Sequence, residues 1–290
     1  MLVDSAYKFV ANDDGTYSLV LNLTTSADAL VQAFAEGGSI TLGADIVLDT
    51  SLTVAAGKEV VLDLNGCDIT YTTDVQAASP LIENKGTLTI VGEGTLRYLA
   101  TAPATGGNPG YASNTITNRG NLTIGEGVVV LNSSSGGASY GVDNYASLHL
   151  DGGTIKANNT ALRVAPYSSS PVEVVIDSGL IEGGIAVRVQ LPHSDHNVAS
   201  NVTVTVNGGT LRSTDVDLYY YSLYAYSNGE SFSNTTITIT GGEFYGWAMV
   251  NYFENTEVAD WANVTVSGGY FDCYGVYDYL TETYYPISAE

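Results

Sequence analysis

Two short segments of the chain carry residue types that could do chemistry. His193, Asp195 and His196 have the types and spacing of zinc ligands, but no third histidine lies nearby and the surrounding residues are those of a polar loop. Asp215 and Asp217 are two residues apart, so a strand would place both carboxylates on one face, where they could bind calcium or act as acid and base. We interpret the first segment as a loop and the second as a solvated acidic turn. The sequence therefore predicts no catalytic residue, no metal and no cofactor.

Two arginines occupy equivalent places in similar phrases. Arg163 lies in the segment Ala161–Val164 and Arg188 in the segment Ala186–Val189, and both phrases read Ala, aliphatic, Arg, Val. We expect the two side chains to stack on neighbouring coils of a repeated fold, as cations that relieve an acidic surface. The alternative is a catalytic base or a clamp for a glycan.

Aromatic residues gather in the C-terminal third of the chain. Thirteen of the 21 Tyr lie between Tyr219 and Tyr285, and both Trp lie in the same third. Successive strand residues point to opposite faces, so a run such as 217–226 must expose some rings. Exposed Tyr and Trp suit stacking on sugars or contact with a protein, whereas the alternative is packing within a C-terminal cap. The candidate binding residues are Tyr219, Tyr220, Tyr221, Tyr224, Trp247, Tyr252 and Trp261.

The charge of the chain excludes several partners. Nine Lys and Arg stand against 31 Asp and Glu, which gives a formal net charge of −22. Binding to nucleic-acid phosphates or to an anionic membrane surface is therefore not expected, and no apolar run approaches the length of a membrane span. The first residues also lack a basic segment followed by an apolar one. Either the chain is not exported through a cleaved signal, which slightly favours a virion component, or the signal is not part of this sequence.

The elements that position these side chains follow from a repeated phrase. Alternating apolar and polar residues such as Val204-Thr205-Val206 predict a strand with one buried face, and Gly208-Gly209 predicts a corner after it. This period, with the insertions confined between copies, is typical of a solenoid. The phrase recurs at intervals of 22 to 34 residues from Ile40, Leu62, Leu88, Leu122, Leu148, Val174, Val204, Ile237 and Val264.

A further short strand precedes several copies of the phrase and ends in asparagine. We predict that Asn84, Asn118 and Asn144 stack at one corner and join neighbouring coils through their amides. Before the repeats, the turn residues 12–15 predict a hairpin, and Ser26 and the glycines 37–38 predict the ends of a short helix.

The expected helix has an apolar stripe of Leu30, Val31 and Phe34. We expect it to cover the open end of the repeats, because an uncapped coil exposes its core. The predicted organisation is therefore a hairpin and capping helix in residues 1–38, a solenoid in residues 39–275 and a cap or tail in residues 276–290.

The repeated phrases and the asparagine corner resemble the right-handed parallel β-helix of the pectin-lyase-like superfamily, over about residues 26–275. The resemblance implies an all-β fold of about eight to nine coils. Enzymes of this superfamily cluster acidic residues on outer strands, as calcium ligands or as acid and base. The corresponding outward row is expected to be Asp63, Thr89, Thr123, His149, Val175, Thr205, Thr238 and Thr265.

That row is mostly threonine, so it argues against an enzyme. It also argues against ice binding, because Asp63, His149 and Val175 interrupt it. The same fold places Cys67 and Cys273 about seven coils apart, or ~34 Å at ~4.8 Å per coil, which excludes a disulfide between them.

The function expected from the sequence is that of a non-catalytic structural or adhesive β-helix on a surface. Such a protein would be a phage virion fibre or decoration protein, or an adhesin-like bacterial surface domain, and would lie at an extracellular or virion surface. Its expected partner is a surface glycan or a protein, with a homotrimer as the form if the partner is another copy. The alternative is a polysaccharide lyase or glycoside hydrolase of the pectin-lyase-like superfamily.

Overall fold

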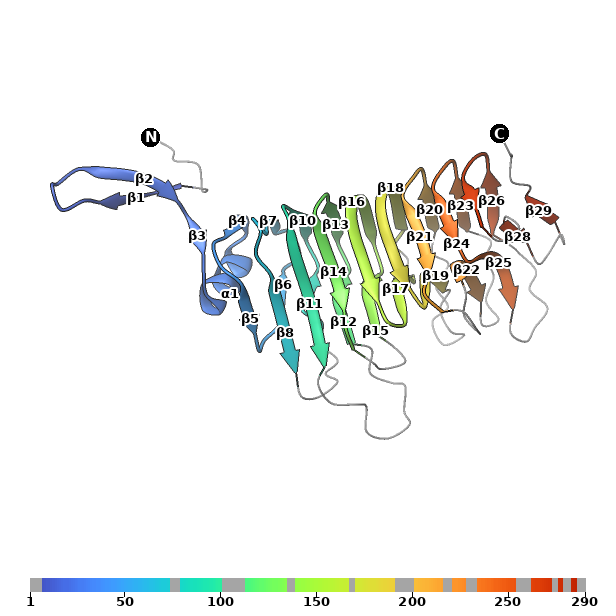
Figure 1. Cartoon of the computed structure of the whole chain (residues 1–290), viewed down its shortest axis with the longest axis horizontal. Coiled ribbons are helices and arrows are strands. Elements are labelled where there is room, and N and C mark those ends of the chain that lie inside the picture. The colour runs from blue at the N-terminus through green and yellow to red at the C-terminus, as the bar shows by residue number, and fades with distance from the viewer. Residues whose placement is uncertain are drawn as a thin grey trace.

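Each repeated phrase forms one coil of a parallel β-helix (Figure 1). The computed structural model describes residues 7–73, 79–100, 113–134, 139–166, 170–190, 201–215, 221–227, 234–253, 262–272, 276–278 and 283–285. Within these residues nine coils follow one another, and their strands form two long sheets of 17 and 10 strands. The expected all-β fold, with its hairpin and capping helix, is confirmed.

The first two strands of each coil belong to the 17-stranded sheet. The first strands are β4 (Gly38–Leu42), β7 (Glu59–Asp63), β10 (Thr87–Val91), β13 (Asn121–Gly125), β16 (Ser147–Ala157), β18 (Val172–Gly183), β20 (Val202–Val206), β23 (Thr235–Ile239) and β26 (Asn263–Val266). β16 and β18 continue round the corner and also serve as second strands. The other second strands are β5 (Ile46–Leu48), β8 (Ile69–Thr73), β11 (Gly94–Ala100), β14 (Val128–Asn132), β21 (Thr210–Ser213), β24 (Glu243–Tyr245) and β27 (Tyr270–Phe271).

The third strand of each coil belongs to the 10-stranded sheet. Its strands are β6 (Leu52–Val54), β9 (Ile82–Asn84), β12 (Ser113–Asn118), β15 (Ser139–Asn144), β17 (Thr160–Val164), β19 (Ile185–Gln190), β22 (Tyr221–Ser227), β25 (Trp247–Phe253) and β28 (Val276–Asp278), followed by the antiparallel β29 (Thr283–Tyr285). All other neighbours in this sheet are parallel, so one side chain of each coil lies directly above its counterpart in the next.

Alternation within each strand builds one continuous core. Val204 pairs with Val174 on one side and Ile237 on the other, and all three are fully buried. Two aromatic pairs fill wider parts of this core: Tyr71 with Tyr98, and Phe244 with Phe271. The core therefore runs along the whole stack of coils and holds the outward residues in fixed rows.

The asparagine corner is confirmed as a ladder of buried amides. Asn84 Nδ2 donates to Asn118 Oδ1 at 2.8 Å, and Asn118 Nδ2 donates to Asn144 Oδ1 at 2.6 Å. All three side chains are fully buried. The ladder is bounded by Val54 below and Val164 above, which occupy the same position in the adjacent coils.

The outward row of the first strands is confirmed for seven of its eight expected members. Thr89, Thr123, His149, Val175, Thr205, Thr238 and Thr265 lie in register. Asp63 was wrongly assigned, because it pairs with Val91 and Val61 lies beside Thr89. Aligning the phrases that begin at Leu62 and Leu88 would place Gly66 beside Gly92. In the structure Gly66 lies beside Gly94, since the Gly66 amide donates to the Glu93 carbonyl. A shift of two residues preserves the alternation, so the pattern alone could not detect it.

The helix α1 (Ala27–Glu36) covers the N-terminal end of the coils, as predicted (Figure 1). Ser26 Oγ accepts the Ala29 amide at 3.4 Å, and Gly37 ends the helix with a positive φ of 83°. Leu30 and Phe34 are buried against the first coil, but Val31 is 36% exposed and does not belong to the buried stripe. Before the helix, β1 (Tyr7–Ala11) and β2 (Tyr17–Leu21) form the predicted hairpin, and β3 (Leu23–Thr24) joins the 17-stranded sheet beside β4.

Candidate functional site

The candidate aromatic residues divide into those that the structure describes and those that it does not. Tyr219, Tyr220 and Trp261 lie outside the described residues, as does the side chain of Tyr252, whose backbone belongs to β25. Tyr221 and Tyr224 lie on β22 and Trp247 lies on β25. His193, Asp195, His196, Asp217 and Cys273 also fall outside the described residues.

Tyr221 and Tyr224 stack on the outer face of the 10-stranded sheet. Their ring centroids are 4.6 Å apart and their planes are inclined by 18°. Both rings pack with Ile185 and Met249, in a cluster separate from the core that contains Leu223. The backbone register continues this cluster toward the C-terminus, because Tyr221 pairs with Trp247. We call Ile185, Tyr221, Tyr224, Trp247 and Met249 the aromatic patch.

A second group of aromatic side chains lies on the 17-stranded sheet. Arg212 lies over the Tyr245 ring at 4.9 Å, and Tyr245 and Tyr270 have ring centroids 6.0 Å apart. The Tyr245 hydroxyl donates to Glu243 Oε2 at 3.1 Å, and this hydrogen bond, followed by burial, raises the pKa of the phenol. Gly246 forms the corner between the two sheets, so Tyr245 and Trp247 do not share a face although they are two residues apart.

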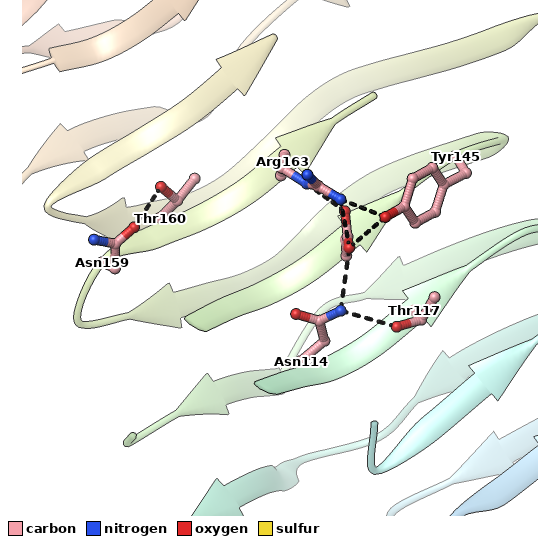
Figure 2. Close-up of polar contacts among 7 residues, drawn as sticks. Asn114, Thr117, Tyr145, Asn159, Thr160 and Arg163 are labelled. Carbon is pink, nitrogen blue, oxygen red and sulfur yellow. Dashed lines mark hydrogen bonds and ion pairs between the residues drawn. The ribbon is translucent and has the colours of Figure 1, made fainter. Parts of the chain in front are cut away.

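A buried polar cluster occupies the same outer face of the 10-stranded sheet, in the three coils directly before the aromatic patch (Figure 2). Arg163 donates from Nε to Asp143 Oδ1 at 2.7 Å and from Nη2 to Asp143 Oδ2 at 2.8 Å. The Tyr145 hydroxyl and Asn114 Nδ2 donate to the same Oδ2 at 2.8 and 3.1 Å, and Asn114 Nδ2 also donates to Thr117 Oγ1. We call Asn114, Thr117, Asp143, Tyr145 and Arg163 the polar clamp.

The two charged side chains of the clamp are largely buried. The side chains of Asp143 and Arg163 are 3% and 17% exposed. Burial lowers the pKa of Arg163, but the charge of Asp143 and its hydrogen bonds outweigh burial and raise that pKa overall. Burial, followed by the charge of Asp143, raises the pKa of the Tyr145 phenol well above its usual range. Both groups therefore stay protonated at neutral pH.

The hydrogen bonds that Asp143 accepts limit the chemistry that the polar clamp can do. Four hydrogen bonds reach the Asp143 carboxylate, about the number that it can accept. Its members come from three consecutive coils, those of β12, β15 and β17. A buried carboxylate that accepts one hydrogen bond at Oδ1 and three at Oδ2 is suited to joining coils rather than to binding a metal or moving a proton.

The predicted alignment of Arg163 with Arg188 is confirmed, since the two residues pair in register on β17 and β19. The ion pair of Arg163 with Asp143 was not predicted from the sequence. Asp143 precedes Asn144 as Arg163 precedes Val164, and these opposite charges at the same position of consecutive coils were the signal that could have revealed it.

The threonine row carries one histidine and carboxylate contact. His149 Nε2 lies 2.8 Å from Asp177 Oδ2, and both side chains are about two-fifths exposed. Asn207 donates to Asp177 Oδ1 at 2.8 Å, and Thr240 donates to Asn207. The hydrogen bond from Asn207, followed by that from His149, lowers the pKa of Asp177.

No known protein family, curated protein or solved structure matches this chain. Among the described residues, no three His, Cys, Asp or Glu side chains gather as metal ligands would, and no helix is long and apolar enough to span a membrane. Cys67 is a half-buried free thiol, and burial raises its pKa. Among the described residues, three features on the outside of the coils are candidates for a functional role: the aromatic patch, the polar clamp and the contact between His149 and Asp177.

Proposed function

We propose that this chain is a non-catalytic structural and adhesive β-helix, related to the pectin-lyase-like superfamily and displayed at an extracellular or virion surface. The observation that carries the proposal is the half-buried ring of Tyr221, which stacks on the buried Tyr224 and lies in register with the half-buried Trp247 on an outer face. Rigid rings lose little conformational entropy when they are covered, so such a patch is suited to contact with a partner. A phage fibre or decoration protein and an adhesin-like bacterial domain both fit this role.

The partner that fits the patch is a surface glycan or an apolar protein surface. Sugar rings and protein side chains both present apolar faces that stack on Tyr and Trp. Tyr219, Tyr220, Tyr252 and Trp261 remain candidates for the same surface. The net charge of −22 does not attract either partner, so binding should change little with ionic strength.

The test is an array of neutral and acidic glycans, probed at low and high salt with the wild type and with Trp247→Ala. The matched control is Tyr245→Ala, since Tyr245 lies near Trp247 in sequence but on the other sheet. We expect binding that is insensitive to salt, at least tenfold weaker in Trp247→Ala, and retained in Tyr245→Ala. Equal binding by the wild type and Trp247→Ala would remove the patch as the contact surface.

A second candidate function is that of a polysaccharide lyase or hydrolase, and the contact between His149 and Asp177 favours it. A carboxylate that accepts from one ring nitrogen fixes the histidine tautomer and leaves the other nitrogen to act as a base. Both side chains are about two-fifths exposed, and His149 lies on an outer strand, where enzymes of the superfamily place their sites. Product formation from polygalacturonate or mixed glycans, with and without calcium, that disappears in His149→Ala would establish this function instead.

A further inference from the structure

The first strands of the last three coils present a regular array of small polar side chains, mostly hydroxyls. β20, β23 and β26 each point two of these side chains outward, the first a Thr or Asn and the second a Thr. They lie in register from coil to coil without a shift, whereas the pairing of β22 with β25 on the other sheet is shifted twice. We call this array the threonine grid, and its members are Thr203, Thr205, Thr236, Thr238, Asn263 and Thr265.

The threonine grid carries neither a charge nor a ring. β20, β23 and β26 contain no charged and no aromatic residue, although every other described strand of these coils contains at least one. The chain as a whole has a net charge of −22, and 13 of its 21 Tyr lie in this third. The four threonines of β20 and β23 are half-buried, and the two side chains of β26 are exposed. The grid is therefore suited to a regular, uncharged surface rather than to an ionic partner or a stacked sugar ring.

The residues that interrupt the outward row lie outside the grid. Asp63 does not belong to the row, because Val61 lies beside Thr89. His149 and Val175 lie on β16 and β18, in the two coils before β20. The interruptions that count against ice binding for the whole row are therefore absent from the grid.

The spacing of the grid is similar to that of an ice surface. Outward side chains on one strand are about 6.6 Å apart, and neighbouring coils are ~4.8 Å apart. On the prism faces of an ice crystal, oxygen atoms repeat at similar distances along two perpendicular directions. Threonine is stiff at χ1, so its hydroxyl and methyl groups are held in place before any contact forms. A hydroxyl also costs less to remove from liquid water than a charged group does.

We propose that the threonine grid is a binding site for the surface of an ice crystal. The hydroxyls would exchange hydrogen bonds with the outermost water molecules of the crystal, and the methyl groups would lie between those molecules. An insoluble neutral polysaccharide is another regular and uncharged surface, but its sugars stack on exposed rings, which the grid lacks. Ice that grows around a bound protein has a curved surface, so its freezing temperature falls while its melting temperature stays the same.

The experiment follows the growth of single ice crystals in solutions of the full chain, over a range of protein concentrations. The wild type should separate the freezing from the melting temperature and should be taken up by slowly growing ice, which excludes most proteins. Thr238→Tyr places a ring at the centre of the grid and should remove most of both effects, and Asn263→Tyr should reduce them from an exposed edge. The matched control is Thr154→Tyr, which should behave as the wild type. Thr154 is also half-buried, but it lies beyond the glycine corner of β16, on the second strand of its coil.

Three results would overturn the proposal. The first is a wild type that leaves the freezing temperature unchanged and stays out of the ice. The second is an equal effect of the wild type and Thr238→Tyr, and the third is an equal loss in Thr238→Tyr and Thr154→Tyr. Binding of the wild type to cellulose or chitin that Thr238→Tyr removes, with no effect on ice, would assign the grid to a polysaccharide instead.

Two further measurements keep these results distinct from other causes. Circular dichroism and the midpoint of urea unfolding should match the wild type in all three variants, because each substituted side chain points outward. The grid and the aromatic patch lie on different sheets. Ice binding without glycan binding, or the reverse, would therefore separate this proposal from the proposed function.

Discussion

The outer face of the 10-stranded sheet holds two regions that share one backbone row but differ in chemistry. In the earlier coils the row reads Thr117, Asp143 and Arg163, and Asp143 accepts hydrogen bonds from Asn114 and Arg163 of the neighbouring coils. In the later coils the same row reads Arg188, Tyr224 and Met249, and Tyr224 and Met249 pack together in the aromatic patch. A parallel β-helix thus fixes where a side chain stands, and the residue type decides whether that place holds a network of hydrogen bonds or a cluster of packed rings.

The largest expected effect comes from opening the polar clamp. Arg163→Met leaves the Asp143 carboxylate buried without its cation, so the free energy of unfolding should fall by about 3–5 kcal/mol. Urea unfolding followed by circular dichroism measures this. Arg212→Met is the control, because Arg212 makes an exposed ion pair with Glu182 and its loss should cost less than about 1 kcal/mol.

The double variant Asp143→Leu with Arg163→Met sharpens this prediction. It removes both charges, so it should recover most of the stability lost in Arg163→Met alone. A double variant as unstable as the single one would show that the clamp acts through shape rather than through charge.

The next effect in size concerns the asparagine ladder. Asn118→Leu keeps a side chain of similar volume but leaves the Asn144 Oδ1 atom and a neighbouring amide without their bonds, which should cost about 2–3 kcal/mol. Asn121→Ala removes an exposed asparagine three residues later and should change stability by less than about 0.5 kcal/mol. Similar midpoints of urea unfolding for the two variants would contradict a role of the ladder in joining coils.

The smallest effect is expected at the exposed contact between His149 and Asp177. The pKa of Asp177 is lowered in the fold, so its contribution to stability is present above the unfolded pKa of about 3.9 and is lost as pH falls through the lower folded value. Because both side chains are well exposed, Asp177→Asn should cost less than about 1 kcal/mol at pH 7 and nothing in strong acid. NMR titration should give Asp177 a pKa below 3.9 that rises in Asn207→Ala; an unchanged value would assign the shift to another cause.

The fold was predictable from the sequence because each coil repeats the same local signals. Alternation such as Val204-Thr205-Val206 fixes the buried face, and the glycine corner that follows fixes the turn. The asparagine ladder was predictable for the same reason, since its amides recur at one position of consecutive coils. The register of Asp63 was not predictable, because a shift of two residues along the strand leaves every buried position buried.

The outer sites were harder to predict than the core. Partners such as Asp143 and Arg163 lie 20 residues apart, and only the exact alignment of two coils brings them together. The aromatic residues appeared as one set in the sequence because 13 Tyr fall within one third of the chain. The corner at Gly246 divides them between two sheets, and a composition count cannot detect a corner.

The most direct test of the division between the polar clamp and the proposed contact surface uses the glycan that the wild type binds most tightly on the array. Its dissociation constant is measured by calorimetric titration for Tyr221→Ala and for Tyr245→Ala. Tyr221 belongs to the stacked pair of the aromatic patch, whereas Tyr245 lies on the other sheet. We predict a dissociation constant at least tenfold higher for Tyr221→Ala, with its unfolding midpoint close to that of the wild type, and an unchanged constant for Tyr245→Ala. An unchanged constant for Tyr221→Ala, or an equal loss in Tyr245→Ala, would contradict the assignment of the contact surface to the 10-stranded sheet.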